Sequence, residues 1–152
     1  MQIKNCSAED VLPLRHKILR PGRDISSAVY AEDQDKTTSH IAVVDSDKTI
    51  AVLTLLTTKK LPNYLESLSL PTNAFVQLRG MAVDEGQQGK GVGKFLIENT
   101  INQLAETGVY KILWCNARTY ALPFYVKLGF KVVGDEFIVP DVGPHFVMYK
   151  TI

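Results

Sequence analysis

The segment Gly86–Lys94, the glycine loop, contains the residues that most directly indicate chemistry. Its glycines stand at positions 86, 89, 91 and 93, with Lys90 and Lys94 beside them, and a helical pattern of apolar residues follows at once. The first amides of a helix have no intrahelical partner and, together with the helix dipole, favour an anion such as a phosphate. Glycines allow the backbone to approach that group closely, and lysines can add charge-assisted contacts.

Two common phosphate-binding motifs do not fit the glycine loop. A P-loop follows the pattern GxxxxGK(S/T), but Gly93-Lys94 is followed by Phe95, and Gln88 stands in place of the first glycine. The dinucleotide fingerprint GxGxxG would require glycine where Lys94 stands. What remains is a Q-x-x-G-x-G pattern over residues 88–93. A plain tight turn is the alternative interpretation of this pattern.

A second motif lies further along the chain. Residues 116–130 read NARTYALPFYVKLGF and follow a predicted strand, whereas residues 78–83, LRGMAV, precede the glycine loop. In this order the stretches resemble the GCN5-related N-acetyltransferases, which combine the loop with an N-x(n)-A-x-x-F-Y-x-x-x-G-F block. The resemblance is detailed from about residue 74 to about residue 150. It implies a single N-acetyltransferase domain over 1–152 that transfers acetyl from acetyl-CoA to a primary amine by direct attack in a ternary complex.

The resemblance also implies an α/β fold. Its sheet is mixed and mostly antiparallel, with about six to seven strands, splayed between the fourth and fifth and flanked by about four helices. The residue patterns predict strands over 1–5, 40–45, 49–58, 74–83, 110–115, 130–139 and 145–150. They predict helices after Ser7 and over about 91–107 and 120–128, and an irregular segment over 59–73.

Several cofactor contacts are implied by the resemblance. Backbone groups of the strand at Met81, Ala82 and Val83 would bind the pantetheine arm as an added strand does. A backbone N–H near Met81 would polarise the thioester carbonyl in the gap between the splayed strands. The pyrophosphate would lie on the amides of Gln88, Gly89, Lys90, Gly91, Val92, Gly93 and Lys94. Asn116, placed just past the end of a strand, would bond the pantetheine, or else serves as a loop or helix-cap residue.

Tyr125 is the residue that the resemblance implies as the catalytic acid. The reaction expels a thiolate, and a phenol with a pKa of about 10 can protonate a thiolate whose conjugate acid has a pKa of about 8.5. The alternative is that Tyr125 belongs to the core, like Phe124 beside it.

A general base is harder to assign. Removing a proton from an alkyl amine at pH 7 costs roughly 4–5 kcal/mol. Several family members use a glutamate four residues before the position of Met81, and here that residue is Gln77. Glu136, on a predicted strand, and His145, which opens the last predicted strand, are the two substitutes. His145 is the histidine of a G-P-H sequence that resembles a G-(I/V)-P-H turn of some bacterial family members. Each is alternatively a surface or turn residue, and a water chain is the third possibility.

Arg79 is the candidate substrate-binding residue. Period-two alternation places it on one strand face with Gln77 and Met81 if no bulge intervenes, so it would point toward the acceptor and bind a carboxylate. More arginines occur over residues 15–23, where they either bind an anionic group or form a solvated helix face. Acidic residues at 32, 33 and 35 carry the opposite charge.

Composition excludes several protein classes. The 152 residues carry 17 basic and 16 acidic side chains, which argues against nucleic-acid binding. No apolar run is long enough for a transmembrane helix, and the N-terminus lacks a signal-peptide core, so we expect a cytoplasmic chain without membrane contact. The two cysteines, Cys6 and Cys115, lie far apart and predict no metal site. The expected partner is a small-molecule or peptide amine, with a homodimer as a possibility. The alternative function is a non-catalytic acyl-CoA-binding or sensing module, which need not keep Tyr125.

Overall fold

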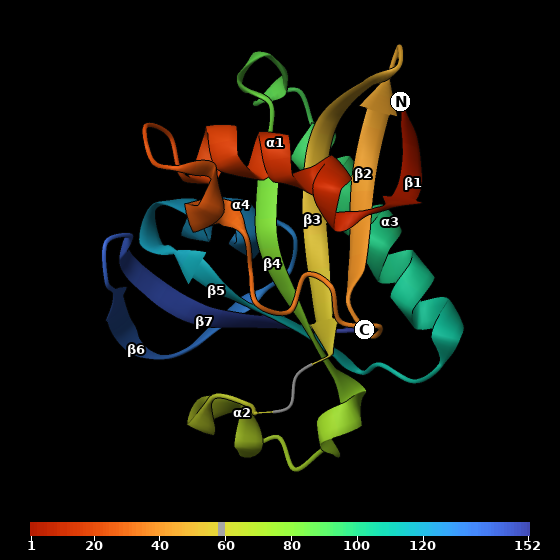
Figure 1. The fold of residues 1–152 in the computed structure, drawn as a ribbon. Helices are drawn as coiled ribbons and strands as arrows, with labels where there is room; N and C mark the ends of the chain where they lie inside the picture. Colours follow the sequence, from red (N-terminus) through yellow and green to blue (C-terminus); the bar gives the residue numbers. More distant parts are fainter. Residues whose placement is uncertain (58–59) are drawn as a thin grey trace. The chain divides into compact units, whose positions relative to one another are not determined.

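The computed structural model describes residues 1–57 and 60–152. Its strands are β1 (Gln2–Cys6), β2 (Ser39–Asp45), β3 (Lys48–Thr57), β4 (Phe75–Val83), β5 (Ile112–Arg118), β6 (Lys131–Val139) and β7 (Gly143–Thr151). They form one seven-stranded sheet in the order β1-β2-β3-β4-β5-β7-β6 (Figure 1). The pairs β1–β2, β2–β3, β5–β7 and β6–β7 are antiparallel, and β4–β5 is parallel. The predicted mixed sheet of an α/β protein is therefore confirmed.

The described residues also form four α-helices and four short 3-10 helices. The α-helices are α1 (Ala8–Leu19), α2 (Asn63–Glu66), α3 (Val92–Thr107) and α4 (Leu122–Lys127). The 3-10 helices are η1 (Ile25–Ala28), η2 (Thr72–Ala74), η3 (Glu85–Gln87) and η4 (Thr119–Ala121). Because parallel strands need a long crossover connection, the chain between β4 and β5 contains the whole of α3.

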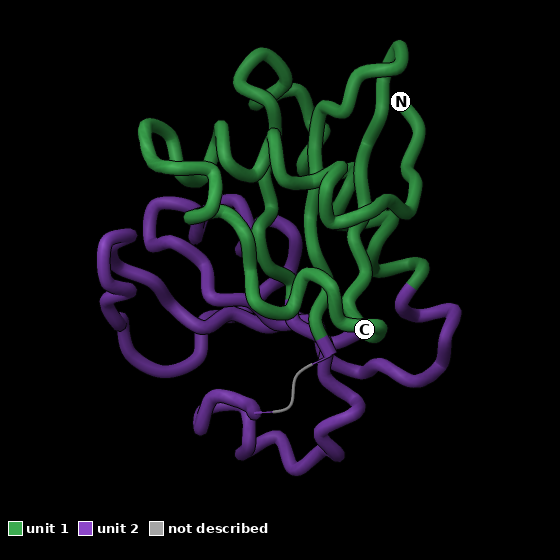
Figure 2. Tube along the Cα trace, in the orientation of Figure 1, with its two compact units in different colours: residues 1–56, 78–103 green, residues 57–77, 104–152 purple. Residues whose placement is uncertain are grey.

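The chain divides into two compact units, which Figure 2 distinguishes by colour. The first unit comprises Met1–Leu56 and Leu78–Gln103, and the second comprises Thr57–Gln77 and Leu104–Ile152. Both β4 and α3 contribute residues to each unit. The single acetyltransferase domain over residues 1–152 stays a prediction.

In the first unit, α1 packs on the sheet and crosses in front of β3 and β4 (Figure 1). Ser7 caps this helix as predicted: its hydroxyl accepts the Asp10 N–H at 3.2 Å, and the Asp10 carboxylate accepts the Ser7 N–H at 2.9 Å. The buried cluster beneath α1 consists of Val11, Leu14, Ala42, Val52 and Ala82. Each fully buried Val or Leu side chain in such a cluster contributes roughly 1.5–3 kcal/mol.

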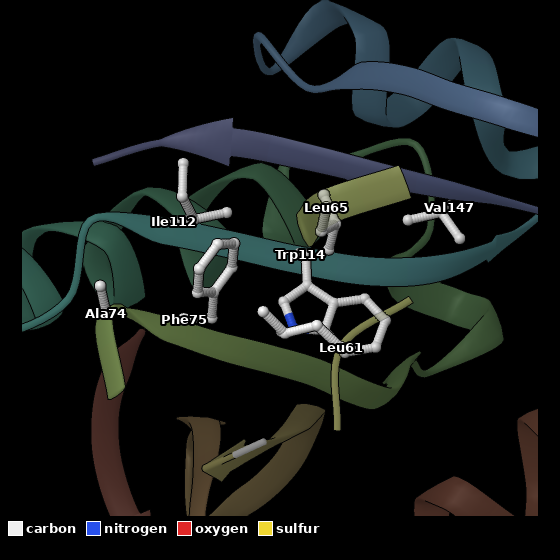
Figure 3. Close-up of a cluster of buried hydrophobic side chains, with 7 residues drawn as sticks. All are labelled: Leu61, Leu65, Ala74, Phe75, Ile112, Trp114 and Val147. Atoms are coloured by element: carbon white, nitrogen blue, oxygen red, sulfur yellow. The ribbon is translucent and has the colours of Figure 1, made fainter. Parts of the chain in front are cut away.

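The second unit has its own apolar core on β4, β5 and β7 (Figure 3). Its buried residues are Leu61, Leu65, Ala74, Phe75, Ile112, Trp114 and Val147. The parallel ladder pairs Phe75 with Ile112 and Gln77 with Trp114, so the large rings of β4 and β5 enter one cluster. Leu61 and Leu65, which flank the start of α2, contribute to the same cluster. This core supports the strand β5 on which candidate site residues lie.

Some predicted boundaries are wrong. The strand predicted to end at Cys115 continues to Arg118, because its last residues pair with β7. The helix predicted from residue 120 begins at Leu122 after the 3-10 turn η4. The segment predicted to be irregular contains α2 and η2. Thr58, the last residue of one predicted strand, and Lys59 lie outside the described residues.

No helix in the described ranges combines the length and the apolar character that crossing a membrane requires.

Candidate functional site

The glycine loop belongs to the first unit and leads from β4 into α3. Gly89 and Gly91 have φ values of +73° and +82°, a region that side chains other than glycine rarely adopt. Among the described residues, a Cβ atom built at either position would meet no atom within 4 Å beyond the glycine itself and its two chain neighbours. The backbone conformation therefore favours glycine at both positions. The side of each residue where a Cβ atom would lie is open. Such a loop leaves room for a ligand beside the main chain.

Gly91 also caps α3, because its carbonyl oxygen accepts the Phe95 N–H at 2.9 Å. The amides of Val92, Gly93 and Lys94 precede that bond and lie in the first turn, where no intrahelical acceptor exists for them. At the other end of the loop, the Gln88 side-chain amide donates to the Val83 carbonyl at 3.0 Å. The loop thus presents first-turn amides that lack an intrahelical acceptor, and the Gln88 bond fixes where the loop begins.

The two lysines of the loop differ in their surroundings. Lys90 is exposed, and the Lys94 ammonium lies 3.8 Å from the Glu98 carboxylate in an i,i+4 pair. Exposed pairs of this kind contribute only about 0.2–0.5 kcal/mol, so Lys94 can exchange Glu98 for another anion. Both ammonium groups can therefore add to the charge at the loop.

Asp84 anchors the start of the loop, and sequence patterns alone did not identify it. Its Oδ1 accepts a hydrogen bond from Lys17 Nζ at 2.7 Å, and its Oδ2 accepts one from Lys48 Nζ at 3.0 Å. Its backbone N–H donates to the Ile50 carbonyl at 2.9 Å. The hydrogen bond from Lys17 and then that from Lys48 hold the pKa of the Asp84 carboxyl below its usual value. No local motif pairs residues so far apart, so the signal exists only in the fold.

The strand residues predicted to bind the pantetheine arm lie on β4. Ala82 is buried in the core of the first unit, whereas Met81 and Val83 are half-buried. Gly80, immediately before them, has φ +61°, which interrupts the extended geometry of the strand. The prediction that Arg79 and Met81 lie on one face of the strand required regular extended backbone between them. Gly80 breaks that regularity, so the prediction does not hold.

Arg79 nevertheless has an exposed and polar environment in the first unit. Its Nη1 lies 3.4 Å from Glu32 Oε2, and its guanidinium lies 3.9 Å from the centroid of the Tyr30 ring. Among the other N-terminal arginines, Arg15 is fully buried and pairs with Asp33 at 2.8 Å. The interpretation of these arginines as a solvated helix face is therefore wrong for Arg15.

Tyr125 lies on α4 in the second unit. Its side chain is only 8% exposed, and its ring makes edge contacts with Phe124 and Phe130 at centroid distances of 5.1 and 5.3 Å. Burial, and secondarily the proximity of Cys115 and Tyr120, raise the pKa of the phenol well above its usual value of 10. The phenol is therefore protonated near neutral pH, as an exposed phenol also is, and burial makes it a weaker acid. A core role, the alternative, fits the same packing.

Asn116 lies within β5, not past its end. It is exposed and stands opposite Val147 of β7 in the antiparallel ladder. The alternative interpretation as a loop or helix-cap residue is therefore wrong, because the strand continues through this position. Its exposed amide can donate and accept hydrogen bonds.

His145 is the third residue of β7 and does not open that strand. It is 6% exposed and stacks on Phe137 at a centroid distance of 5.8 Å, so it is not a surface or turn residue. Its Nδ1 lies 2.8 Å from the Gly143 carbonyl oxygen. Because a carbonyl only accepts, we assign the proton of the neutral ring to Nδ1. Nε2 then carries the lone pair that a base requires.

Glu136 lies on β6 between Val133 and Phe137, where the ladder to β7 changes register. Its side chain is exposed, and its Oε2 accepts a hydrogen bond from the Thr119 hydroxyl at 2.9 Å. The bond ties β6 to η4, which immediately precedes α4. The Glu136 carboxylate is therefore exposed to solvent, and one of its two oxygens already accepts a hydrogen bond.

The described residues contain no cluster of three or more His, Cys, Asp or Glu side chains arranged to hold a metal ion.

Comparisons with known proteins agree on one family. Residues 14–151 match the family model of the acetyltransferase (GNAT) domain. The chain is 36% identical over 152 residues to a Bacillus subtilis (strain 168) protein named Uncharacterized N-acetyltransferase YitI, covering 100% of this chain and 97% of that protein.

Solved structures show the same fold. A putative N-acetyltransferase from Lactobacillus plantarum superposes with a TM-score of 0.77 at 16% identity, with 99% of each chain covered. An aminoglycoside 6'-N-acetyltransferase complexed with coenzyme A gives a TM-score of 0.75 at 16% identity, covering 99% of this chain and 97% of that one. Since the family model spans nearly the whole sequence, the chain belongs to the GNAT family of acetyltransferases.

Proposed function

We propose that the chain transfers an acetyl group from acetyl-CoA to a primary amine by direct attack in a ternary complex. The observation that carries this proposal is the glycine loop, whose left-handed glycines leave open space beside the first-turn amides of α3. That geometry suits a pyrophosphate, which coenzyme A contains. A structural neighbour complexed with coenzyme A supports the same choice of co-substrate.

The chemistry assigns a task to each candidate residue. The amine nitrogen attacks the thioester carbonyl carbon, the carbon–sulfur bond breaks, and the released thiolate takes a proton. Tyr125 supplies that proton, since its phenol is protonated near neutral pH. The backbone N–H near Met81 stabilises the developing oxyanion, and Asn116 bonds the pantetheine arm.

The amine must also lose a proton, and His145 is the base that the structure favours. Its Nδ1 is directed at the Gly143 carbonyl, which leaves Nε2 free of the ring proton in the neutral tautomer. Glu136 is the second candidate, and its bond to Thr119 already uses one carboxylate oxygen. Proton loss through water is the third route.

The first test separates binding from fold. Wild type should bind acetyl-CoA with micromolar affinity in a calorimetric titration, and Gly91→Glu should abolish that binding, because a side chain at φ +82° distorts the loop and adds a negative charge. Gly22→Glu is the matched control, since Gly22 also has a positive φ, +75°, and open space around it but lies outside the loop. Equal loss in both variants would show a general folding defect instead.

The second test separates an enzyme from a binding module. A library of amines is incubated with saturating acetyl-CoA, and release of free CoA thiol is followed. Turnover with one class of amine supports the proposed activity. Tight acetyl-CoA binding without turnover of any amine would support the alternative, a non-catalytic acyl-CoA sensor. No binding by a well-folded wild type would refute both.

A further inference from the structure

The ring of Tyr30 contacts two arginine side chains of the first unit. The guanidinium carbon of Arg15 lies 4.1 Å from the ring centroid, and that of Arg79 lies 3.9 Å from it. A tyrosine face attracts a cation, and the planar guanidinium also stacks on it. The two arginines differ in exposure: the Arg15 side chain is fully buried, whereas 42% of the Arg79 side chain is exposed. Tyr30 therefore joins a buried cation to an exposed one.

The buried side is a polar network around Arg15. Its Nη1 donates to Asp33 Oδ2 at 2.8 Å and to the Ala28 carbonyl at 3.0 Å, and its Nη2 donates to the Thr54 hydroxyl at 2.6 Å. Asp33 Oδ2 also accepts the Tyr30 N–H at 2.9 Å. Within the described ranges, Arg15 Nε and Asp33 Oδ1 are buried without a hydrogen-bond partner. A buried pair with unsatisfied atoms adds little net stability. Its contacts to the ring and the backbone N–H of Tyr30 hold that residue in position.

Gly80 brings the backbone of β4 against this network. A Cβ atom at this position would lie 2.8 Å from Arg15 Nε and 2.9 Å from Tyr30 Cε2, closer than real Cβ atoms come to their neighbours. The absence of a side chain at Gly80 is therefore what permits the contact. Since Arg79 is the preceding residue, the same close approach delivers its guanidinium to the Tyr30 ring.

The exposed side is held much more weakly. Among residues 1–57 and 60–152, the polar partner of the Arg79 guanidinium is Glu32, at 3.4 Å from Nη1 to Oε2. Well-formed charge-assisted bonds of this kind are about 2.7–2.9 Å long. The Glu32 side chain is 45% exposed, and exposed ion pairs contribute little. The Tyr30 ring thus holds the flat face of the Arg79 guanidinium. The N–H groups on the guanidinium edge can exchange Glu32 for another partner.

We propose that Arg79, stacked on Tyr30, binds a carboxylate of the acceptor amine, and that Glu32 occupies the same guanidinium edge until that carboxylate displaces it. The inference rests on the proposed amine acetylation and specifies its acceptor class as amines that carry a carboxylate. Arg79 is the binding residue, Tyr30 is its positioning residue, and Glu32 is an internal competitor.

The charges favour a carboxylate over a phosphate. A guanidinium edge matches the two oxygens of a carboxylate, and two parallel bonds would replace the single long contact to Glu32. Glu32 remains nearby after displacement, because it lies two residues from Tyr30 in the chain. A phosphate carries both of its charges on the one group that contacts Arg79, so it would meet stronger repulsion from Glu32 than a carboxylate group, which carries one.

A binding experiment tests this without any catalysis. The ¹⁵N-labelled protein is titrated with sodium succinate, and with succinamide as the neutral match, while the side-chain Nε–H resonance of Arg79 is followed. We expect succinate but not succinamide to shift this resonance. Glu32→Gln, which removes the competing charge, should tighten succinate binding about three- to fivefold. Arg79→Lys, which keeps the charge but loses the planar fork, should weaken binding on the order of tenfold, followed by the remaining amide shifts.

The role of Tyr30 is tested by the same succinate titration. Tyr30→Phe keeps an aromatic ring under Arg79 and should bind succinate as wild type does, whereas Tyr30→Leu removes the ring and should weaken succinate binding. In turnover assays, Glu32→Gln should lower the KM of an amino acid more than it changes the KM of the matching amino acid amide.

The proposal is overturned if wild type and Glu32→Gln bind succinate equally, if succinamide binds as well as succinate, or if no variant binds succinate. Acetyl-CoA titration of the same preparations reports on the proposed acetyltransferase activity separately. Retained acetyl-CoA binding together with absent succinate binding would therefore refute the carboxylate site alone.

Discussion

The glycine loop and the surroundings of Tyr125 offer two different kinds of chemistry. The loop presents main-chain amides, and a Cβ atom added at Gly89 or Gly91 would meet none of the described residues beyond its chain neighbours within 4 Å. Tyr125, in the second unit, presents a phenol that is enclosed by Phe124 and Phe130. A main-chain site depends on backbone conformation, whereas a side-chain site depends on packing and on the pKa that packing imposes. Substitutions in the two regions should therefore change different measured quantities.

The largest effect is expected from Tyr125→Phe. The substitution preserves the ring packing but removes the proton that the leaving thiolate needs, so kcat should fall at least tenfold and as much as about a hundredfold. The dissociation constant of acetyl-CoA should remain within about twofold of wild type, since the loop is untouched. Steady-state kinetics and calorimetry on one preparation measure both. Unchanged turnover would leave Tyr125 as a core residue only.

A smaller loss of turnover is expected from His145→Gln, with Glu136→Gln as its matched comparison. Removing the base should lower kcat about tenfold or more, because the amine must then lose its proton to water. Glu136→Gln keeps the hydrogen bond from Thr119 and should retain most of the activity. The reverse ranking of the two variants would transfer the role of base to Glu136. Equal and full activity in both would favour the water route.

Gly91→Ala should weaken acetyl-CoA binding and leave the chemical step unchanged. An alanine at φ +82° is strained by roughly 1–2 kcal/mol, which corresponds to about a five- to thirtyfold weaker acetyl-CoA affinity if the loop relaxes to avoid the strain. The kcat at saturating acetyl-CoA should stay near that of wild type. Gly22→Ala, with the same kind of backbone strain outside the loop, is the control and should bind normally. A fall in kcat with unchanged acetyl-CoA affinity would contradict the idea that the glycine loop acts on binding and Tyr125 on the chemical step.

The smallest effect is expected from Asp84→Asn, and it depends on pH. Because Lys17 and Lys48 lower the folded-state pKa of Asp84 below 3.8, the carboxylate stabilises the fold above that value. The stabilisation is lost as pH falls from about 3.8 through the folded-state pKa. Thermal unfolding of wild type should therefore lose a component in that acid range that Asp84→Asn lacks. Parallel curves for the two proteins from pH 7 down to pH 2 would show that the pairs add nothing.

The parts predictable from the sequence are those with local causes. The glycine spacing at residues 88–93 predicts the loop because glycine adopts the left-handed conformation most readily, and Ser7 as an N-cap residue predicts the start of α1. The mixed sheet followed from the order of the predicted strands and helices and from the family resemblance.

The parts that could not be predicted depend on pairs distant in sequence. Strand β5 extends to Arg118 because β7 supplies partners up to His145, and the sequence near residue 116 contains no sign of that ladder. The ion pairs of Asp84 and of Arg15 likewise join separate elements. Gly80 reads as an ordinary strand glycine until its neighbours are known.

The anchoring of Asp84 also bears on how fast a ligand reaches the loop. Lys17 and Lys48 share the Asp84 carboxylate, and Glu85 also attracts Lys17, so the two ammonium groups offset both carboxylates and leave exposed Lys90 as the surplus positive charge of the loop. Because Lys90 is exposed, its field extends outward over roughly a Debye length, about 8 Å at physiological ionic strength. A polyanion diffusing near the first unit is drawn toward the loop before it makes any contact. The ion pairs of Asp84, which fix the backbone before the loop, thus also affect the rate at which a polyanion encounters the loop, and that rate falls as the salt concentration rises.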